Sequence, residues 1–321
     1  MRETVLTVTD LCAGYSEKPM VSNVTFSLEK GEIFCIVGES GCGKSTLMKA
    51  ILGTTPGLRV LSGSIRLGET ELTALPPVQR QKLGTEAMGV VFQNPGSSFN
   101  PIRSYKKQFI ETLKSHGMYD KDKFMSQVET AFGKLGLTDT ERIINSCPYE
   151  MSGGMNQRIA MAITLILGQE ILLADEPTSA LDATIQMQMA QELRHLRDVS
   201  GISQIIVTHN LALAEFLGDR IAVMYSGRVV ELGEASDVLH DPRHPYTKSL
   251  IAAIPSLDGM MPVGLPGSPP MTGPAELGCE FAPRCPCAGN DCAQRAYALT
   301  DIGNGHFVSC QGRRELNPYR P

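Results

Sequence analysis

GESGCGKS, at residues 38–45, fits the pattern G-x-x-x-x-G-K-[ST] and is followed by Thr46. An apolar run at residues 33–37 precedes it, and a helix is expected to begin near Lys44. Glycines let backbone N–H groups converge on phosphate oxygens, and a helix N-terminus adds positive charge. Lys44 is expected to reach the β- and γ-phosphates of a nucleotide, and the Ser45 hydroxyl to hold Mg²⁺. The expected nucleotide-binding residues here are Gly38, Glu39, Ser40, Gly41, Cys42, Gly43, Lys44, Ser45 and Thr46.

Strands and helices alternate along the rest of the chain. Short apolar runs are typical of strands buried on both faces, and longer amphipathic segments of helices. The strands are expected at residues 88–92, 171–174 and 205–207, and the helices at about 104–145 and 183–199. A hairpin turning at Ser226-Gly227 is also expected. This order predicts an α/β protein with a parallel sheet covered on both sides.

Two adjacent carboxylates, Asp175 and Glu176, end the apolar run at 171–174. The carboxyl ends of parallel strands face the ligand crevice of such a sheet. Asp175 can orient Mg²⁺, and Glu176 is placed to polarise a water molecule that attacks a phosphate. Alone, the pair is as often a solvated acidic turn, but after a phosphate-binding loop it indicates phosphoryl transfer.

Composition excludes several classes of function. The chain has 321 residues and a formal net charge of −5, so it shows no bulk attraction to nucleic acid. Its most continuous apolar stretch, residues 159–168, is about half of the roughly 20 residues that cross a bilayer, and the N-terminus is unlike a secretory signal. A soluble chain is therefore expected, one that serves any membrane process by docking.

The stretch MSGGMNQR, which begins at Met151, narrows the class. It resembles the LSGGQ-type signature of ATP-binding-cassette proteins, with Met151 where Leu is usual, a swap that conserves volume. A serine and two glycines can also cap a helix that begins near Met155, which would be a second anion site. The resemblance implies that Ser152, Gly153 and Gly154 bind the γ-phosphate of an ATP held by a partner subunit.

Other motifs follow in the order of this family. Gln93 resembles the Q-loop glutamine, which contacts Mg²⁺ or the water and couples to membrane subunits, and Asp182 lies in a segment similar to the D-loop at the dimer interface. His209 resembles the switch histidine near the γ-phosphate, and Tyr15 stands where the family stacks a ring on adenine. Alone, such a histidine or tyrosine is usually structural. The resemblance implies catalytic roles for Glu176, His209 and Gln93, and Mg²⁺ binding by Ser45, Gln93 and Asp175.

Two segments resemble the oligopeptide, dipeptide and nickel importer branch, namely NPGSSFNP at 94–101 and HPYTKSL at 244–250. The resemblance implies an ATPase that drives uptake of dipeptides or oligopeptides, with nickel or a metal chelate as the alternative solute. It implies a peripheral position at the cytoplasmic face of the plasma (inner) membrane. The implied partners are a second ATPase subunit, often a different chain, two transmembrane permeases and an extracellular solute-binding protein, with no nucleic acid. The segment between Gln93 and Met151 would contact the permeases.

The same resemblance implies the fold and its divisions. We expect a P-loop NTPase cassette with a mostly parallel core sheet, an antiparallel β subdomain, an inserted helical subdomain and a small Cys-rich C-terminal extension. The cassette is expected over 1–257, with its helical subdomain at about 100–165. A Pro/Gly-rich linker is expected over 258–278, and the extension over 279–321.

Five of the nine cysteines lie close to the C-terminus. Cys279, Cys285, Cys292 and Cys310 are similar to the C-terminal cysteine pattern of the same branch, some members of which carry a [4Fe–4S] cluster. Four thiolates on a short segment can hold such a cluster or a Zn²⁺ ion. Cys287 is a fifth candidate ligand, and free cysteines packed as small hydrophobic residues are the other alternative.

Rival classes fit less well. A soluble, non-transport cassette ATPase for DNA repair needs a long insertion, and only residues 93–151 are available. Ribosome-associated cassette proteins typically carry two cassettes, whereas this chain has one set of motifs. Exporter cassettes are often fused to membrane spans. A pure nucleotide-binding module would not need both Glu176 and His209.

Overall fold

A computed structural model describes most of the chain, which folds into two compact units. The described residues are 3–91, 99–178, 183–254, 264–265, 267–268, 278–294 and 298–310. The first unit comprises Met1–Val5, Leu28–Ile33 and Leu75–Val207, and the second Leu6–Ser27, Phe34–Ala74 and Thr208–Pro321. Most of the segment expected to be a linker lies outside the described residues. The expected cassette and extension boundaries stay a prediction.

Parallel strands form the centre of the first unit. Strands β6 (Met88–Val91), β7 (Ile171–Asp175) and β8 (Ser203–Thr208) are neighbours in that order and run parallel. All six residues of β8 and the first four of β7 are buried. Helices α2 (Pro77–Ala87) and α7 (Ala183–Ser200) belong to the same unit. The continuous apolar runs therefore form buried parallel strands, as the sequence predicted.

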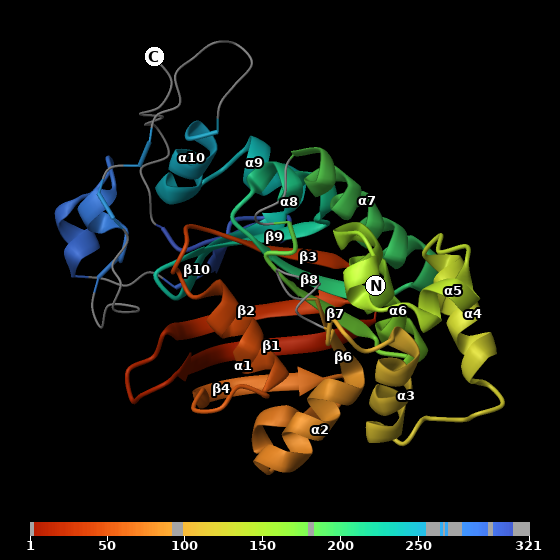
Figure 1. The fold of residues 1–321 in the computed structure, drawn as a ribbon. Coiled ribbons are helices and arrows are strands. Elements are labelled where there is room, and N and C mark those ends of the chain that lie inside the picture. Colours follow the sequence, from red (N-terminus) through yellow and green to blue (C-terminus); the bar gives the residue numbers. More distant parts are fainter. Residues whose placement is uncertain are drawn as a thin grey trace. The chain divides into compact units, whose positions relative to one another are not determined.

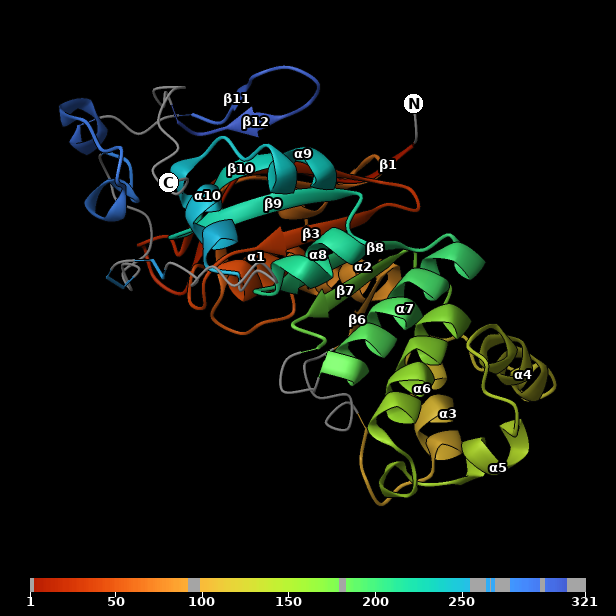
Figure 2. The ribbon, with the colours of Figure 1, turned by 90° about the horizontal axis from the view of Figure 1, so that it is seen from above.

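Four further helices gather at one end of this unit (Figures 1 and 2). They are α3 (Tyr105–Ser115), α4 (Phe124–Lys134), α5 (Thr140–Asn145) and α6 (Gly153–Ile166). Helix α3 buries Tyr105, Phe109 and Leu113, which lie four residues apart on one helix face. The Phe109 ring meets Phe132 of α4 edge to face, with centroids 6.2 Å apart.

The stretch 104–145 was expected to be helical, and the structure divides it into three helices. The Met118 N–H donates to the Leu113 carbonyl at 2.8 Å, which closes the end of α3. The Leu137 N–H donates to the Phe132 carbonyl at 2.9 Å, which closes α4 in the same way. These bonds satisfy terminal carbonyls and turn the chain. No helix in the described ranges is long and apolar enough to cross a membrane.

An antiparallel sheet forms one layer of the second unit. Its strands lie in the order β2 (Val21–Glu29), β1 (Thr4–Gly14), β4 (Arg59–Leu67) and β5 (Thr70–Glu71). Val24, Phe26 and Leu28 are buried on alternate positions of β2. The Phe26 ring stacks on Phe34 at 4.7 Å and so joins this sheet to the strand before the phosphate-binding loop.

A mixed set of strands forms the rest of the second unit. Strand β3 (Ile33–Val37) runs parallel to β9 (Arg220–Tyr225), and β9 forms an antiparallel hairpin with β10 (Arg228–Glu234). Tyr225 pairs with Arg228, so the hairpin turns at Ser226-Gly227 as predicted. The short strands β12 (Phe307–Val308) and β11 (Thr300–Asp301) extend the sheet from β10. The helices are α1 (Lys44–Leu52), α8 (Leu211–Leu217), α9 (Ala235–His240) and α10 (Pro245–Ala252).

Candidate nucleotide-binding site

The predicted phosphate-binding loop connects β3 to α1 in the second unit. At Gly38 the backbone φ is 153°, and an added Cβ would lie 2.2 Å from the Met224 carbonyl oxygen, so no larger residue fits. The Gly227 N–H donates to the Cys42 carbonyl at 2.8 Å. The turn of the β9–β10 hairpin therefore holds the loop backbone at Cys42.

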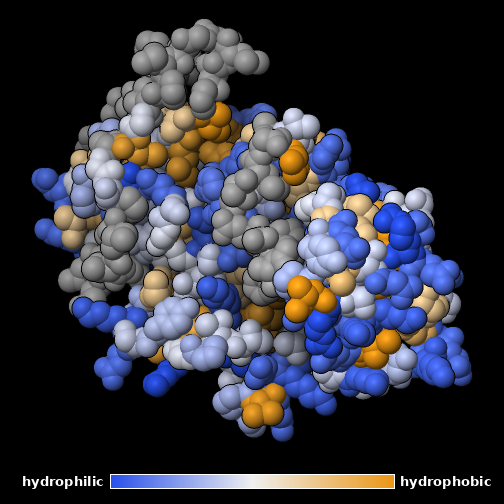
Figure 3. All heavy atoms as spheres, viewed as in Figure 1, coloured by the Kyte–Doolittle hydropathy of each residue, from blue (hydrophilic) through white to orange (hydrophobic). Residues whose placement is uncertain are grey.

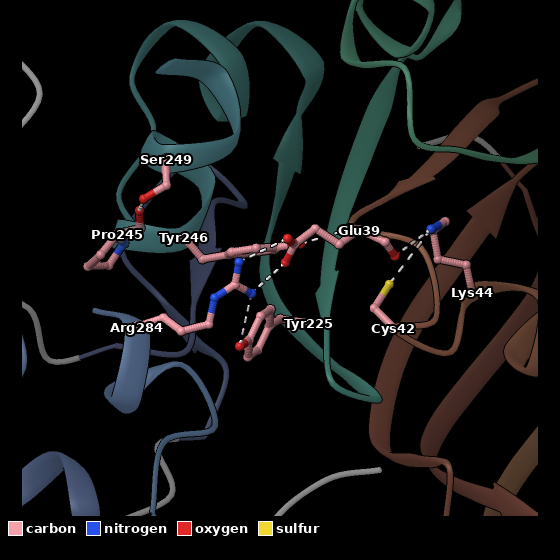
Figure 4. Close-up of polar contacts among 8 residues, drawn as sticks. All are labelled: Glu39, Cys42, Lys44, Tyr225, Pro245, Tyr246, Ser249 and Arg284. Atoms are coloured by element: carbon pink, nitrogen blue, oxygen red, sulfur yellow. Dashed lines mark hydrogen bonds and ion pairs between the residues drawn. The ribbon is translucent and has the colours of Figure 1, made fainter. Parts of the chain in front are cut away.

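Lys44 is held inside this loop. Its side chain is almost fully buried, and Nζ donates to the Gly38 carbonyl at 2.8 Å. Nζ also donates to the Glu39 carbonyl at 2.9 Å (Figure 4). Loop carbonyls thus compensate the buried cation. Ser45 follows in the first turn of α1 and is half-buried. At a helix N-terminus, a lysine can donate hydrogen bonds to the oxygens of a triphosphate, and a hydroxyl oxygen can bind its Mg²⁺.

The Cys42 thiol lies 3.8 Å from Lys44 Nζ. Burial raises the pKa of Cys42, and the nearby Lys44 charge only partly opposes that effect. Cys42 as a whole is 2% exposed. Cys42 therefore packs as a small hydrophobic side chain inside the loop.

Asp175 and Glu176 lie where β7 ends, in the first unit. Both are half-buried, and Glu176 has a left-handed φ of 50°. The Glu176 N–H donates to the Val207 carbonyl of β8 at 2.8 Å, which holds this uncommon conformation in place. The two carboxylates are hard oxygen donors of the kind that Mg²⁺ prefers.

The signature stretch begins helix α6 in the first unit. Ser152 is the N-cap, and its side chain accepts a hydrogen bond from the Met155 N–H at 3.3 Å, as the sequence predicted. The helix itself begins at Gly153, two residues before the expected start. Ser152, Gly153 and Gly154 are exposed. Their N–H groups and the helix N-terminus are available to an anion outside this unit.

The Asn156 side chain forms hydrogen bonds that hold this stretch in place, and none of the sequence motifs indicated this role. Its Nδ2 donates to the carbonyls of Pro148 at 3.0 Å and Ser152 at 3.2 Å. Its Oδ1 accepts a hydrogen bond from the Tyr105 hydroxyl. The signal available in the sequence was a polar amide in the first turn of a helix whose buried side is mostly apolar.

The remaining predicted residues divide into two groups. His209 follows β8 directly and is exposed, and Tyr15 is 48% exposed. Gln93 and Asp182 lie outside the described residues. The roles expected for all four stay predictions.

The five C-terminal cysteines all lie among the described residues of the second unit and are half-buried. The Cys279 N–H donates to the Cys292 carbonyl at 2.7 Å, which brings these two positions together. Burial, and then the neighbouring Cys287, Cys279 and Cys310, raise the pKa of Cys285 to about 12. Within the described ranges no three His, Cys, Asp or Glu side chains are arranged to hold a metal ion. The predicted ligand set does not converge in this structure.

A cavity of about 660 Å³ also lies in the second unit. Residues of β1, β2, β9, β10 and β12 line it, and its polar lining includes Asp10, Thr25, Arg220 and Arg228. None of the predicted nucleotide-binding residues is among those that line it. The cavity is therefore separate from the phosphate-binding loop.

Comparison with known proteins defines the class of this chain. Residues 21–179 match the family model for ABC transporters, and residues 230–292 match that of the oligopeptide/dipeptide transporter C-terminal region. The ATP-binding cassette MJ0796, solved as a dimer in a post-hydrolysis state with ADP and Pi, superimposes with a TM-score of 0.60 at 25% identity. The match covers 72% of this chain and 98% of that one. The expected cassette fold is confirmed.

Curated relatives narrow the class to a branch. The dipeptide transport ATP-binding protein DppD of Bacillus subtilis is 36% identical over 294 residues, which cover 90% of this chain and 88% of DppD. The oligopeptide transport ATP-binding protein OppD of Mycobacterium bovis is 35% identical over 98% of this chain. The chain spans about half the length of that relative, 54%. It belongs to the ABC transporter ATP-binding proteins, in their oligopeptide/dipeptide branch.

Proposed function

We propose that this chain is the ATP-hydrolysing subunit of an ABC importer for dipeptides or oligopeptides. The observation that carries the proposal is the formed phosphate-binding loop, in which Lys44 lies buried between the Gly38 and Glu39 carbonyls. Its relatives DppD and OppD are named as dipeptide and oligopeptide transport ATP-binding proteins. Nickel or a metal chelate is the alternative solute.

In this proposal each polar residue has a distinct task. Lys44 leaves the loop carbonyls and contacts the β- and γ-phosphates of ATP. The Ser45 hydroxyl, the Asp175 carboxylate and the Gln93 amide hold Mg²⁺, which supplies charge neutralisation at the phosphates. Glu176 accepts the proton of the attacking water, and His209 contacts the γ-phosphate.

A second cassette completes the site. The exposed N-terminus of α6, at Ser152, Gly153 and Gly154, is suited to bind the γ-phosphate of ATP on a partner subunit. Asp182 is expected at the same interface. The dimer reported for the similar cassette MJ0796 supports this arrangement. The partner cassette is an identical chain or a different one.

The test of the ATPase is a pair of substitutions. Glu176→Gln removes the proton acceptor, so hydrolysis should fall at least about 100-fold while ATP binding persists. Lys44→Ala removes the phosphate contact, so binding itself should weaken. ATPase rate and equilibrium ATP binding separate the two effects. A Glu176→Gln variant that hydrolyses ATP at the normal rate would contradict the assignment of the base.

In this proposal the chain lies at the cytoplasmic face of the plasma (inner) membrane, bound to two permeases that receive solute from an extracellular binding protein. Apolar side chains are exposed in the segment expected to contact the permeases. Ile102 is 79% exposed and Tyr149 is 71% exposed. Figure 3 shows such apolar residues interspersed among hydrophilic ones over the helices of the first unit. Exposed side chains of this size can act as anchors when a partner buries them.

Co-purification with the permeases tests this surface. Ile102→Ser and Tyr149→Ser should weaken the complex. Val78→Ser is the matched control, because Val78 is also 79% exposed but lies on α2, outside that segment.

Uptake of labelled dipeptides, oligopeptides and nickel by cells that carry the whole importer identifies the solute.

We further propose a [4Fe–4S] cluster at Cys279, Cys285, Cys292 and Cys310, with Cys287 as a fifth candidate and zinc as the alternative metal. The bond between the Cys279 N–H and the Cys292 carbonyl supports it, because it brings the backbones of two of the four candidate ligands together. An absorption spectrum with iron, sulfide and zinc analysis on protein purified without oxygen tests it. Broad absorbance near 400 nm with about four irons per chain is expected. One zinc ion per chain would instead identify a structural zinc site. Metal-free protein would contradict the proposal of a bound metal.

A further inference from the structure

We propose that Arg284, which lies between the C-terminal cysteines, is a positioning residue for the phosphate-binding loop, so that ATP binding depends on it. This inference rests on the proposed ATPase function. Arg284 ends a short 3₁₀ turn, Ala282–Arg284, and is separated from the loop by 245 positions in the sequence. Both partners belong to the second unit.

The contact is a bidentate ion pair with Glu39, the second residue of the loop (Figure 4). Arg284 Nη1 donates to Glu39 Oε2 at 2.7 Å, and Nη2 donates to Oε1 at 3.0 Å. The Arg284 side chain is 6% exposed and that of Glu39 is 23% exposed. A paired guanidinium–carboxylate fork away from water fixes orientation more strongly than a surface ion pair does.

Glu39 is held through its backbone as well. Its N–H donates to the Tyr246 hydroxyl oxygen of α10 at 2.9 Å. Arg284 Nη1 also donates to the Tyr225 hydroxyl at 3.3 Å, and its guanidinium carbon lies 5.7 Å from the centre of that ring. Tyr246 thus holds the Glu39 backbone, Arg284 holds the Glu39 carboxylate, and Tyr225 in turn contacts Arg284.

Glu39 is also hydrogen-bonded directly to Lys44, the lysine proposed to contact the phosphates. The Glu39 carbonyl accepts a hydrogen bond from Lys44 Nζ at 2.9 Å. Arg284 also neutralises a carboxylate that would otherwise stand next to a bound polyanion. Loss of Arg284 would release the Glu39 side chain and leave its charge uncompensated, and both effects disfavour ATP.

The segment that carries Arg284 is anchored to the second unit by other contacts. Phe281 is 1% exposed, and its ring centroid lies 5.3 Å from those of Tyr225 and Tyr246. Arg228 of β10 forms an ion pair with Glu280 at 2.7 Å. The Arg228–Glu280 ion pair does not include Arg284, so it provides a way to separate attachment of the segment from the action of Arg284.

The experiment measures ATP affinity and steady-state ATPase kinetics on the full chain. Arg284→Ala should raise the Kd for ATP about 5- to 50-fold, with kcat at saturating ATP changed less than about twofold. Arg284→Lys keeps the charge but loses the fork, so it should give a smaller rise. If Arg284→Ala does not fold, as judged by circular dichroism, Arg284→Lys carries the test.

Glu280→Gln is the matched control. It removes the charge of the other ion pair of the same segment, and it should leave the Kd for ATP within about twofold of the wild type. A double variant, Arg284→Ala with Glu39→Ala, should bind ATP no more weakly than Arg284→Ala alone, because the uncompensated carboxylate is gone.

Two results would overturn the inference. One is wild-type ATP affinity in Arg284→Ala and Arg284→Lys. The other is an equal loss of affinity in Glu280→Gln, which would assign the effect to attachment of the segment. A wild-type protein that does not bind ATP would instead contradict the proposed function.

Discussion

The Tyr105 hydroxyl donates a hydrogen bond to Asn156 Oδ1, and this buried contact joins helix α3 to the first turn of α6. The same Asn156 side chain donates to backbone carbonyls of the signature stretch. One amide therefore connects the helices expected to contact permeases with the turn expected to contact a partner's ATP. The contact lies within the first unit.

Asn156→Ala should lower the free energy of unfolding by roughly 2 kcal/mol, because it leaves buried carbonyls and the Tyr105 hydroxyl without this partner. It should also lower the ATPase rate while ATP binding to the loop stays unchanged. Urea unfolding and ATPase assays measure both. Asn145→Ala is the control, since that exposed side chain donates to the Glu141 carbonyl of its own helix. Equal loss of stability in the two variants would argue against an anchoring role.

Gly38→Ala should disrupt the phosphate-binding loop. The added Cβ would lie 2.2 Å from the Met224 carbonyl oxygen, whereas at Gly41, with φ 82°, it would meet nothing within 4 Å. Gly38→Ala should therefore cost more than about 2 kcal/mol and abolish ATP binding, and Gly41→Ala only about 1 kcal/mol from backbone strain. Thermal unfolding with and without ATP compares them. Similar behaviour of the two variants would show that the loop relaxes away from Met224.

Acid should destabilise the second unit through His244. This residue is fully buried, and burial lowers its pKa to about 4 although the neighbouring Glu231 carboxylate raises it. Its Nδ1 accepts a hydrogen bond from the Tyr246 N–H at 3.1 Å, which requires the unprotonated nitrogen. The unfolded histidine binds a proton near pH 6.5 and the folded one only near 4. The unfolded chain therefore takes up more protons in this window, and stability falls as pH drops from about 6.5 to 4.

His244→Asn should flatten that dependence by roughly 2 kcal/mol over the same window, because an asparagine can still accept the Tyr246 N–H but does not titrate. Chemical unfolding at a series of pH values measures the slope. His240→Asn serves as control, since the His240 side chain is 67% exposed. An unchanged slope in His244→Asn would assign the acid sensitivity to other groups.

Thiol modification should reach Cys12 before Cys42. Burial raises the pKa of Cys12, but hydrogen bonds from Ser62, Asn23 and Ser22 outweigh it and lower the pKa below its usual value. Burial raises the pKa of Cys42, so its reactive thiolate is scarce. Iodoacetamide at pH 8 should label Cys12 at least about tenfold faster, as followed by peptide mass spectrometry.

ATPase activity should persist while Cys12 is labelled and fall only when Cys42 reacts. Cys12→Ser isolates the second process. Rapid labelling of Cys42 with loss of activity would instead support a thiol switch in the phosphate-binding loop.

Much of the fold followed from local patterns. The apolar runs that became β3, β7 and β8 needed no partner to be recognised, since strands buried on both faces carry apolar side chains throughout. The Ser226-Gly227 hairpin and the Ser152 cap were also predictable, because turn and cap preferences act over a few residues. The division of residues 104–145 into three helices was not, because helix periodicity alone does not show where a chain turns.

The sequence by itself determined the class of protein, its phosphate-binding loop and its signature stretch, because each of these is a short run of residues with its own backbone requirement. Only the tertiary structure decided that Arg284 pairs with Glu39, and that His244 and Glu231 meet in a buried cluster. Such contacts join segments far apart in the chain, and their partners depend on how whole strands and helices pack. A carboxylate in a glycine-rich loop looks like any solvated charge until folding places a guanidinium beside it.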